Sequence, residues 1–313
     1  MRLRYYRLSN KIKDLSSNPE HADLRGTIIA HHGVAVRVHW DTGKADMTRV
    51  LRKSGFLVGD RVYWENNKLK REDRITELHR ATTAGQTLSV AANIDCVGIV
   101  VAPEPDTSTS FIDQVVVTSR AAQIKSFLVL NKKDLNSFSK FEHQLRQEYQ
   151  SALDIFSVSA KTGDGLNTLK NAVAQYGRGL WVGASGVGKS SLVNSLLQDS
   201  TLAVGNLSEV TGFGKHTTTT ATLHRLKQGG EIVDTPGVRE FIPVQMACAD
   251  IAQFFPGFEQ VLQSDCRFHN CMHHKEPDCV IKDALANKTL SQERYDVYIS
   301  LLEQTEKRNK PDW

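Results

Sequence analysis

The chain has 313 residues, of which 40% are hydrophobic and 24% charged, and its formal net charge is +4. This length allows two or three domains, and this composition excludes a disordered chain. No apolar run approaches the roughly 18 residues that a membrane-spanning helix needs, and the basic N-terminus lacks the apolar stretch of a signal peptide. We therefore expect a cytoplasmic protein with no membrane contact, and a monomer, since no long heptad pattern is present.

The first part of the chain is basic and β-rich. Residues 1–80 carry 17 Lys and Arg against 10 Asp and Glu, so their net charge is +7 and that of the remainder is −3. Between residues 24 and 76, short stretches that alternate apolar and polar residues are separated by glycine turns, which predicts a small β-barrel of OB type. Such a barrel with a basic surface suggests nucleic-acid binding. A docking module with a merely solvated basic surface is the alternative.

The middle part alternates apolar strands with helical segments. Strands are expected at 96–102, 126–134, 154–160, 180–186 and 231–237, and helices near 111–122, 138–149, 165–176 and 189–198. Continuous Val/Ile/Leu strands between helices predict a parallel sheet covered on both faces. A third part holds a Cys/His cluster and a helical tail near 291–307. The predicted domains are 1–80, 81–243 and 244–313.

A glycine-rich segment between a strand and a helix fits the pattern G-x-x-x-x-G-K-[ST]. Its backbone amides and the helix N-terminus can face phosphate groups. Lys189 is expected to reach the β- and γ-phosphates, and Ser190 to supply a hydroxyl to Mg²⁺. The flanking elements favour this interpretation over an ordinary glycine turn. The predicted phosphate-binding residues are Gly183, Ala184, Ser185, Gly186, Val187, Gly188, Lys189, Ser190 and Ser191.

Two polar segments follow two other strands. Residues 131–134 (NKKD) fit the guanine-reading box N-K-x-D, in which Asp134 accepts hydrogen bonds from the ring N1–H and the exocyclic amine of guanine. Against adenine the same carboxylate is left unpaired. Asn131 is expected to brace the loops and the Lys132 stem to cover the base. Residues 159–161 (SAK) match a second box, in which a backbone amide meets guanine O6. The predicted base-reading residues are Asn131, Lys132, Asp134, Ser159, Ala160 and Lys161.

Residues 234–237 (DTPG) match the D-x-x-G box. Asp234 is expected to hold Mg²⁺ through water, and the Gly237 amide to sense the γ-phosphate. The run 215–220 (KHTTTT) lies where a first switch belongs. We assign Thr218 to Mg²⁺, although four consecutive threonines leave the register open and the run is also typical of a β-strand.

These boxes stand in rotated order. Ordinary GTPases place the phosphate loop first, then the switch Thr, DxxG, NKxD and SAK, whereas here NKKD and SAK come first. A rotation preserves every strand-end position if the old termini are joined, and residues 166–183 supply that join. It also places the second switch directly before the Cys/His section, where nucleotide state could bias the appended domain.

The residue after DTPG is Val238, where Ras-type enzymes carry the Gln that orients the attacking water. Valine cannot hydrogen-bond water, so another group has to. We expect His216 to act in hydrolysis, since His is a common water-orienting residue. The alternative is that His216 only shapes the loop.

Five cysteines in a chain without a secretion signal argue against a disulfide framework. Cys266, Cys271, His273 and Cys279 offer three thiolates and one imidazole within 14 residues, which fits a closed structural zinc site. Neighbouring His269 and His274 leave the choice of His open. A redox pair or buried thiols are the alternatives.

Together, the OB-like barrel, NKKD, SAK, GASGVGKSS, GKHTTTT, DTPGVREF and the Cys/His spacing resemble the bacterial RsgA (YjeQ/YloQ) family over nearly the whole chain. The resemblance implies a GTPase that binds GTP and GDP with Mg²⁺, and that binds the small ribosomal subunit and its rRNA. It also implies assistance in late maturation of that subunit, with hydrolysis stimulated by it. It further implies that Ser190 and Thr218 lie near Mg²⁺, that His216 aids hydrolysis, and that Cys266, Cys271, His273 and Cys279 hold one zinc ion per chain. Many members carry a longer basic extension than the roughly 20 residues that precede this barrel. A nucleotide-dependent binding module of another pathway is the second class of function.

Overall fold

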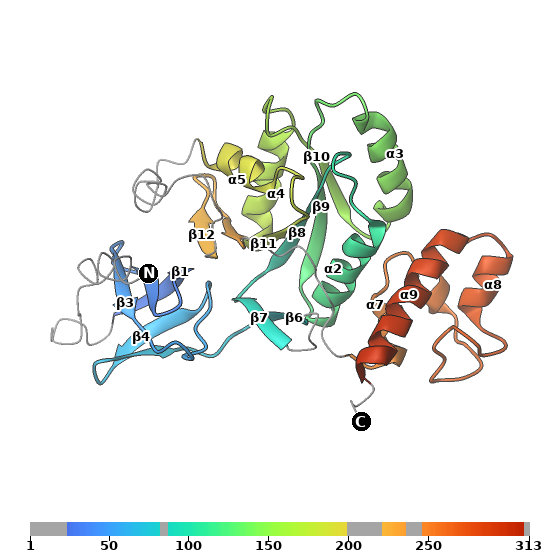
Figure 1. The fold of residues 1–313 in the computed structure, drawn as a ribbon, viewed down its shortest axis with the longest axis horizontal. Coiled ribbons are helices and arrows are strands. Elements are labelled where there is room, and N and C mark those ends of the chain that lie inside the picture. Colours follow the sequence, from blue (N-terminus) through green and yellow to red (C-terminus); the bar gives the residue numbers. More distant parts are fainter. Residues whose placement is uncertain (1–23, 82–86, 199–220, 236–245, 310–313) are drawn as a thin grey trace, which may run out of the picture.

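The computed structural model describes residues 24–81, 87–198, 221–235 and 246–309. Figure 1 shows a β-rich part at one end, an α/β part in the middle and a helical part at the other end. This arrangement confirms the predicted fold class. Within the described ranges, no helix is both long and apolar enough to cross a membrane.

The β-rich part, called the N-terminal barrel below, is antiparallel. β1 is central, with β2 and then β3 on one side and β4 and then β5 on the other. Their bounds are β1 Arg25–His31, β2 Ala35–Trp40, β3 Ala45–Arg49, β4 Arg61–Glu65 and β5 Lys68–Arg71. Alternating side chains such as Ile28, Val36 and Val62 fill a small core. In the described chain β3 and β5 are not paired with each other, so the barrel is partly open, as OB folds are.

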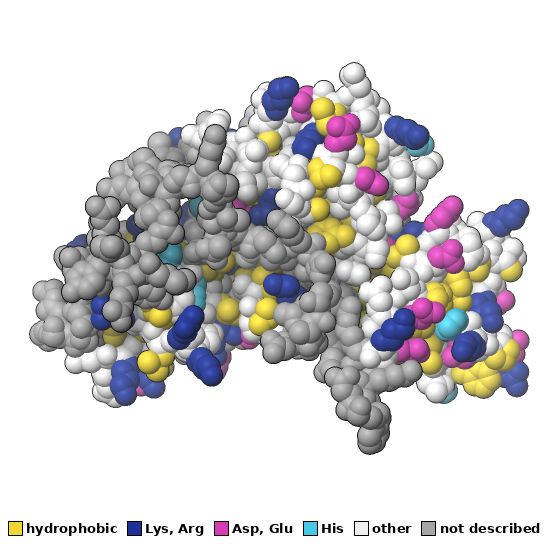
Figure 2. Space-filling model, viewed as in Figure 1, with side chains coloured by type: hydrophobic (Ala, Val, Ile, Leu, Met, Phe, Trp, Pro, Cys, Tyr) yellow, Lys and Arg dark blue, Asp and Glu magenta, His cyan; other side chains and the backbone are white. Residues whose placement is uncertain are grey.

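Basic side chains stand out on the outside of the barrel (Figure 2). The exposed ones are Arg25, Lys44, Arg49, Arg52, Lys53, Lys68, Lys70 and Arg71. Lys70 lies near Glu65 and Arg25 pairs with Glu72, so part of this charge is offset locally. The remainder leaves a positive outer surface.

The barrel and the α/β part are built together. The hairpin of β6 (Glu77–Ala81) and β7 (Thr87–Ala92) connects them, and the predicted boundary between residues 80 and 81 falls inside β6. Leu78 of the hairpin, with Ile29 and Val58 of the barrel, is buried in the same apolar core as Val97 of the α/β part. In addition, Ala30 of β1 pairs with Thr222 of β12, so one sheet runs through both parts.

The central sheet has the predicted parallel strands in the order β10-β9-β8-β11-β13, with β12 antiparallel at the side of the barrel. The strands are β8 Cys96–Val101, β9 Lys125–Leu130, β10 Asp154–Ser157, β11 Arg178–Val182, β12 Thr222–Arg225 and β13 Glu231–Asp234. The helices are α2 Thr109–Ala121, α3 Phe138–Tyr149, α4 Leu166–Tyr176 and α5 Lys189–Leu197. Side chains of α2 and α3 fill one core with the sheet, and those of α4 and α5 fill a second core. The sheet is therefore covered on both faces, as predicted.

The predicted join of the rotated order lies between α4 and β11. Gly177 ends α4 with a φ of 91°, and a Cβ there would stand 2.4 Å from Asp95 Oδ2. That same oxygen accepts a hydrogen bond from the Arg178 backbone N–H at 2.7 Å. Glycine is thus required where the chain turns directly from the helix into the central strand.

The helical part follows β13. It contains η3 Cys248–Asp250, α7 Ile251–Phe254, η4 Val261–Gln263, α8 Val280–Ala286 and α9 Gln292–Asn309. Phe255, Phe258 and Tyr298 pack their rings together in its core. This core includes Val117 of α2, so the helical part is docked on the α2 side of the sheet (Figure 1).

Candidate functional site

The predicted nucleotide boxes meet at one edge of the parallel sheet. The NKKD, SAK, phosphate-loop and DTPG segments follow β9, β10, β11 and β13 respectively. Because these strands are parallel, their carboxyl ends lie on the same edge. Ligands of open α/β sheets bind in the crevice at this edge.

Asn131 joins the loops to one another. Its side chain is 1% exposed, and its Nδ2 donates to the Val187 carbonyl oxygen in the phosphate loop at 2.9 Å. Its Oδ1 accepts from the Ala160 N–H in the SAK loop at 3.1 Å. One amide group therefore links the phosphate-binding segment to both base-reading segments.

Asp134 lies beside the SAK loop with its carboxylate partly open to solvent. Oδ1 accepts a hydrogen bond from the Ser159 hydroxyl at 2.6 Å, and Oδ2 lies 3.8 Å from Lys161 Nζ. The Ser159 hydrogen bond holds the pKa of Asp134 below its usual value, so the carboxylate is ionised at neutral pH. An ionised acceptor is what the N1–H and amine of guanine require.

The glycines of the phosphate loop lie so close to neighbouring atoms that a side chain would not fit. A Cβ at Gly188 would stand 2.5 Å from Asn131 Nδ2, and one at Gly183 would stand 2.5 Å from the Val100 carbonyl oxygen. Gly186 and Gly188 both have a φ of 88°. Val187 is buried, whereas Ser185, Ser190 and Ser191 are exposed and Ala184 lies between these extremes. The loop thus keeps its polar side chains and the start of α5 accessible.

Lys189 forms an ion pair with Asp234, the first residue of the DTPG segment. Both side chains are largely buried, at 12% and 19% exposure. The phosphate-loop lysine and the DxxG carboxylate therefore satisfy each other in this conformation. A phosphate bound in the loop would compete with Asp234 for the lysine.

A fifth segment at this edge was not predicted. Residues 103–106 follow β8, and the carbonyl oxygen of Glu104 accepts a hydrogen bond from Lys132 Nζ at 2.5 Å. The Glu104 carboxylate accepts from the Ser137 hydroxyl at 3.1 Å. Pro105 lies against the phosphate loop, because a Cβ on Gly186 would stand 3.2 Å from Pro105 Cδ. The position of this segment directly after a parallel strand was the signal that could have located it.

Several predicted residues lie outside the described ranges. They are His216 and Thr218 of the first switch, and Gly237 with the neighbouring Val238. The predictions for these residues stay predictions.

The Cys/His cluster is assembled in the helical part. The ligand atoms of Cys266, Cys271, His273 and Cys279 all lie within 4.8 Å of one another. His273 Nδ1 is 3.5 Å from Cys266 Sγ and 3.3 Å from Cys279 Sγ. Four N and S ligands around tetrahedral zinc stand about 3.5–3.8 Å apart, so this donor set fits zinc. Among the described residues, His273 and not His269 or His274 completes the set.

Packing explains why this loop presents His273. The residue has a φ of 57°, and Tyr295 of α9 donates from its hydroxyl to the His273 carbonyl oxygen at 2.8 Å. Tyr298 donates to the Met272 carbonyl oxygen at 2.7 Å. Burial raises the pKa of the Cys271 thiol to about 12, and metal binding would require the thiolate form. Of the other cysteines, Cys96 is buried and Cys248 is half-buried.

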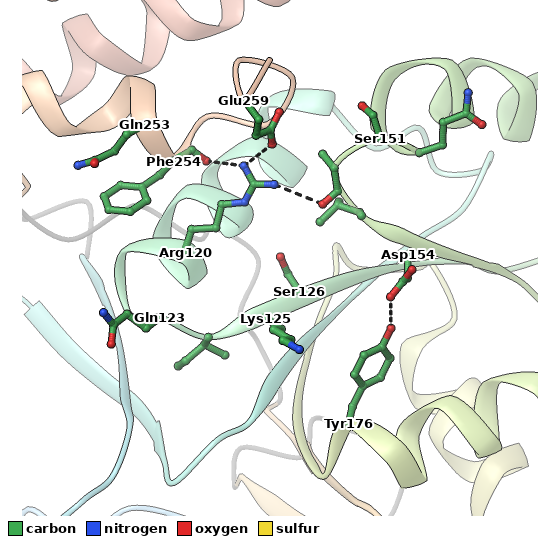
Figure 3. Close-up of a pocket in the computed structure, with 14 residues that line it drawn as sticks. Arg120, Gln123, Lys125, Ser126, Ser151, Asp154, Tyr176, Gln253, Phe254 and Glu259 are labelled. Atoms are coloured by element: carbon green, nitrogen blue, oxygen red, sulfur yellow. Dashed lines mark hydrogen bonds and ion pairs between the residues drawn. The ribbon is translucent and has the colours of Figure 1, made fainter. Parts of the chain in front are cut away.

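A separate cavity lies away from both of these sites. It encloses about 640 Å³ between the amino ends of β9 and β10 and the helical part (Figure 3). Arg120 crosses its wall, where it pairs with Glu259 at 2.6 Å and donates to the Phe254 carbonyl oxygen at 3.2 Å. This cavity is at the opposite edge of the sheet from the phosphate loop.

A phosphate loop, a guanine box and a DxxG aspartate on one sheet edge define a P-loop GTPase, and their order along the chain is circularly permuted. The model of the RsgA GTPase family matches residues 71–242, and that of the 50S ribosome-binding GTPases matches residues 179–309. The chain belongs to the RsgA GTPase family.

Curated relatives are similar over most of the chain. The small ribosomal subunit biogenesis GTPase RsgA of Pseudomonas savastanoi pv. phaseolicola is 38% identical over 292 residues, which cover 88% of this chain and 84% of that protein. The RsgA of Pseudomonas fluorescens Pf-5 is 36% identical over 310 residues, covering 95% and 90%.

Solved structures share the fold. YjeQ from Thermotoga maritima superposes with a TM-score of 0.71 at 27% identity, covering 92% of this chain and 99% of that one. YloQ, described as a circularly permuted GTPase, gives a TM-score of 0.66 and covers 95% and 99%. At 23% identity, the second similarity concerns the fold alone.

Proposed function

We propose that this GTPase binds the small ribosomal subunit and its rRNA, assists late maturation of that subunit, and hydrolyses GTP faster when bound to it. The observation that carries the nucleotide part is Asn131, which hydrogen-bonds the phosphate loop and the SAK loop at once. The names of the curated relatives support the ribosomal part.

In this proposal different residues contact the phosphates, the base and the Mg²⁺ ion of the bound nucleotide. The backbone of residues 183–191 surrounds the phosphates, and Lys189 leaves Asp234 to contact the β- and γ-phosphates. Asp134 reads guanine, with Ser159 and Lys161 at its sides. Bound Mg²⁺ would neutralise charge on the β- and γ-oxygens. Ser190 and Thr218 would be its direct ligands, Asp234 would hold its water, and Gly237 would sense the γ-phosphate.

Hydrolysis needs a group that orients water. Val238 cannot do this, since its side chain has no hydrogen-bonding atom. His216 is the proposed residue, and docking on the subunit would bring it to the γ-phosphate. Unassisted turnover is then slow, on the order of 10⁻⁴ to 10⁻² s⁻¹.

The other two parts serve binding and stability. The exposed Lys and Arg side chains of the N-terminal barrel would contact rRNA phosphates. The Cys/His cluster would hold one structural zinc ion per chain, which would stabilise a part of the protein with a small core. The domain limits 1–80, 81–243 and 244–313, the monomeric state and the cytoplasmic location belong to the same proposal.

The decisive experiment compares GTP turnover by the full chain alone, with purified small subunits and with purified large subunits. Stimulation by small subunits only is the expected result. Equal turnover in the three conditions would favour a nucleotide-dependent binding module of another pathway. Stimulation by large subunits alone would reassign the ribosomal partner.

A further inference from the structure

Helix α2 belongs to two cores at once. Ile112, Val115 and Val116 are buried in the core beneath the central sheet. Val117 is buried in the core of the helical part. Asp113 and Arg120 stand four residues before and three residues after Val117, so the three share one face of the helix. That face is the docking surface of the helical part.

A buried ion pair between α2 and α9 lies in this interface. Arg294 of α9 donates from Nη1 to Asp113 Oδ2 at 2.7 Å, with Asp113 fully buried and Arg294 8% exposed. Arg294 Nη2 also donates to the Pro256 carbonyl oxygen at 2.5 Å. Its guanidinium lies 5.0 Å from the ring centre of Tyr149 and 4.7 Å from that of Phe255. Removal of one partner from such a pair leaves an uncompensated buried charge.

Further contacts connect the Asp113–Arg294 pair to the nucleotide site. The Tyr149 hydroxyl donates to Asp113 Oδ1 at 2.9 Å and lies 3.3 Å from the carbonyl oxygen of Thr109, the first residue of α2. The Ser108 hydroxyl caps this helix by accepting from the Ser110 N–H at 3.2 Å. Thr107 joins that cap to segment 103–106, which contacts both Lys132 and the phosphate loop. The first turn of α2 therefore anchors this segment.

Helix α9 also connects the Asp113–Arg294 pair to the Cys/His cluster. Arg294 and Tyr295 are consecutive in α9, and Tyr298 follows one turn later. The two tyrosines hold the carbonyl oxygens of His273 and Met272. A single helix thus carries the contacts to the metal-binding loop and the buried contact to α2.

We propose that Arg294 is a positioning residue for the nucleotide site. By holding Asp113 and Tyr149, it fixes the first turn of α2 and, through that turn, segment 103–106. It thereby links metal binding by the Cys/His loop to the affinity for nucleotide. This inference rests on the nucleotide site of the proposed function and adds a route of regulation to it. The route runs through packed and hydrogen-bonded contacts, and it is separate from the second switch.

The test uses the zinc-loaded full chain and a fluorescent GDP analogue. Arg294→Met keeps an unbranched apolar stem close to that of arginine and removes the charge and the donors. We expect a loss of GDP affinity of about threefold to tenfold, the size of coupling transmitted through contacts that touch neither ligand. Arg120→Met is the matched control, because it breaks the same interface at the far end of α2 and should leave GDP affinity unchanged. Zinc content and thermal melting confirm that both variants are folded.

Two further measurements make the outcome decisive. Zinc chelation should weaken GDP binding by wild-type protein and add nothing in Arg294→Met, since coupling between two sites is reciprocal and passes through this residue. Tyr149→Phe removes only the hydroxyl and should give a smaller loss in the same direction, and it carries the test if Arg294→Met does not fold. The inference would be overturned if folded Arg294→Met bound GDP with wild-type affinity, or if Tyr149→Phe did so where Arg294→Met does not fold. A loss of GDP affinity in Arg120→Met equal to that in Arg294→Met would also overturn it. Wild-type protein that binds no guanine nucleotide would instead defeat the proposed function.

Discussion

Replacement of Asp134 by Asn is the most direct test of base recognition. Asp134 Oδ1 is bound by the Ser159 hydroxyl at 2.6 Å, and an Asn side-chain oxygen can accept the same hydrogen bond. The loop should therefore keep its conformation. The change instead replaces an ionised acceptor with an amide, whose NH₂ group faces the donors of guanine.

The size of the effect follows from the hydrogen bonds lost. Two bonds to a charged acceptor contribute about 1.5–3 kcal/mol each, so about 3–6 kcal/mol is lost. This corresponds to guanine nucleotide binding that is weaker by about 10²–10⁴-fold. Xanthine carries a carbonyl in place of the exocyclic amine, so its nucleotides should bind Asp134→Asn better than they bind wild-type protein.

The assay is a titration with fluorescent GDP and XDP analogues. Lys133→Ala is the matched control, because Lys133 lies in the same segment but pairs with Asp164 at 2.9 Å and is assigned no contact with the base. It should leave both affinities unchanged. Unaltered GDP affinity in Asp134→Asn, or a loss of GDP binding without improved XDP binding, would remove Asp134 from the base site.

The remaining predictions concern the metal, the barrel and hydrolysis. Purified, tag-free protein should contain about one zinc per chain, and Cys271→Ser should lose it while Cys248→Ser keeps it, as metal analysis would reveal. Small-subunit binding should weaken as salt rises, and a double replacement of Arg52 and Lys53 by Gln should reduce this salt dependence in a sedimentation assay; an unchanged salt slope would exclude these two side chains. His216→Ala should retain GTP binding but lose about 10²–10⁴-fold of the stimulated hydrolysis in single-turnover measurements on saturating subunits. A wild-type stimulated rate would place the water-orienting group elsewhere.

The sequence predicted the central sheet well because its strands are long apolar runs that end in recognisable boxes. β8, β9, β10, β11 and β13 begin within two residues of the expected positions, and the four helices between them also lie within two residues of the expected ranges. β9, β10, β11 and β13 end three or four residues earlier than expected, because the expected ranges included the boxes that follow these strands. The choice of His273 could not be made from spacing, since His269 and His274 are close by. It depends on the backbone conformation of one loop and on two tyrosines from α9, which are distant in sequence.

Other features were missed for physical reasons. β5, β6, β7 and β12 are short, and their polar or mixed residues carry no clear period. The segment 103–106 has no recognised motif, and its contact with Lys132 is made by a backbone carbonyl, which any residue type supplies. The Asp113–Arg294 pair joins residues 181 positions apart, a distance over which local patterns carry no information.

The apolar side chains shared by the barrel and the central sheet decide how this protein can be dissected. Removal of residues 1–80 would take Ile29, Val58 and Leu78 out of a common core and leave β12 as an open edge. Loss of three such side chains costs several kcal/mol, which is a large part of the stability of an ordinary domain. If the truncated protein fails to bind subunits, the cause could be a destabilised GTPase part or the loss of contacts with rRNA, and the experiment would not distinguish them. Surface charge substitutions separate these two causes, because they leave the common core intact.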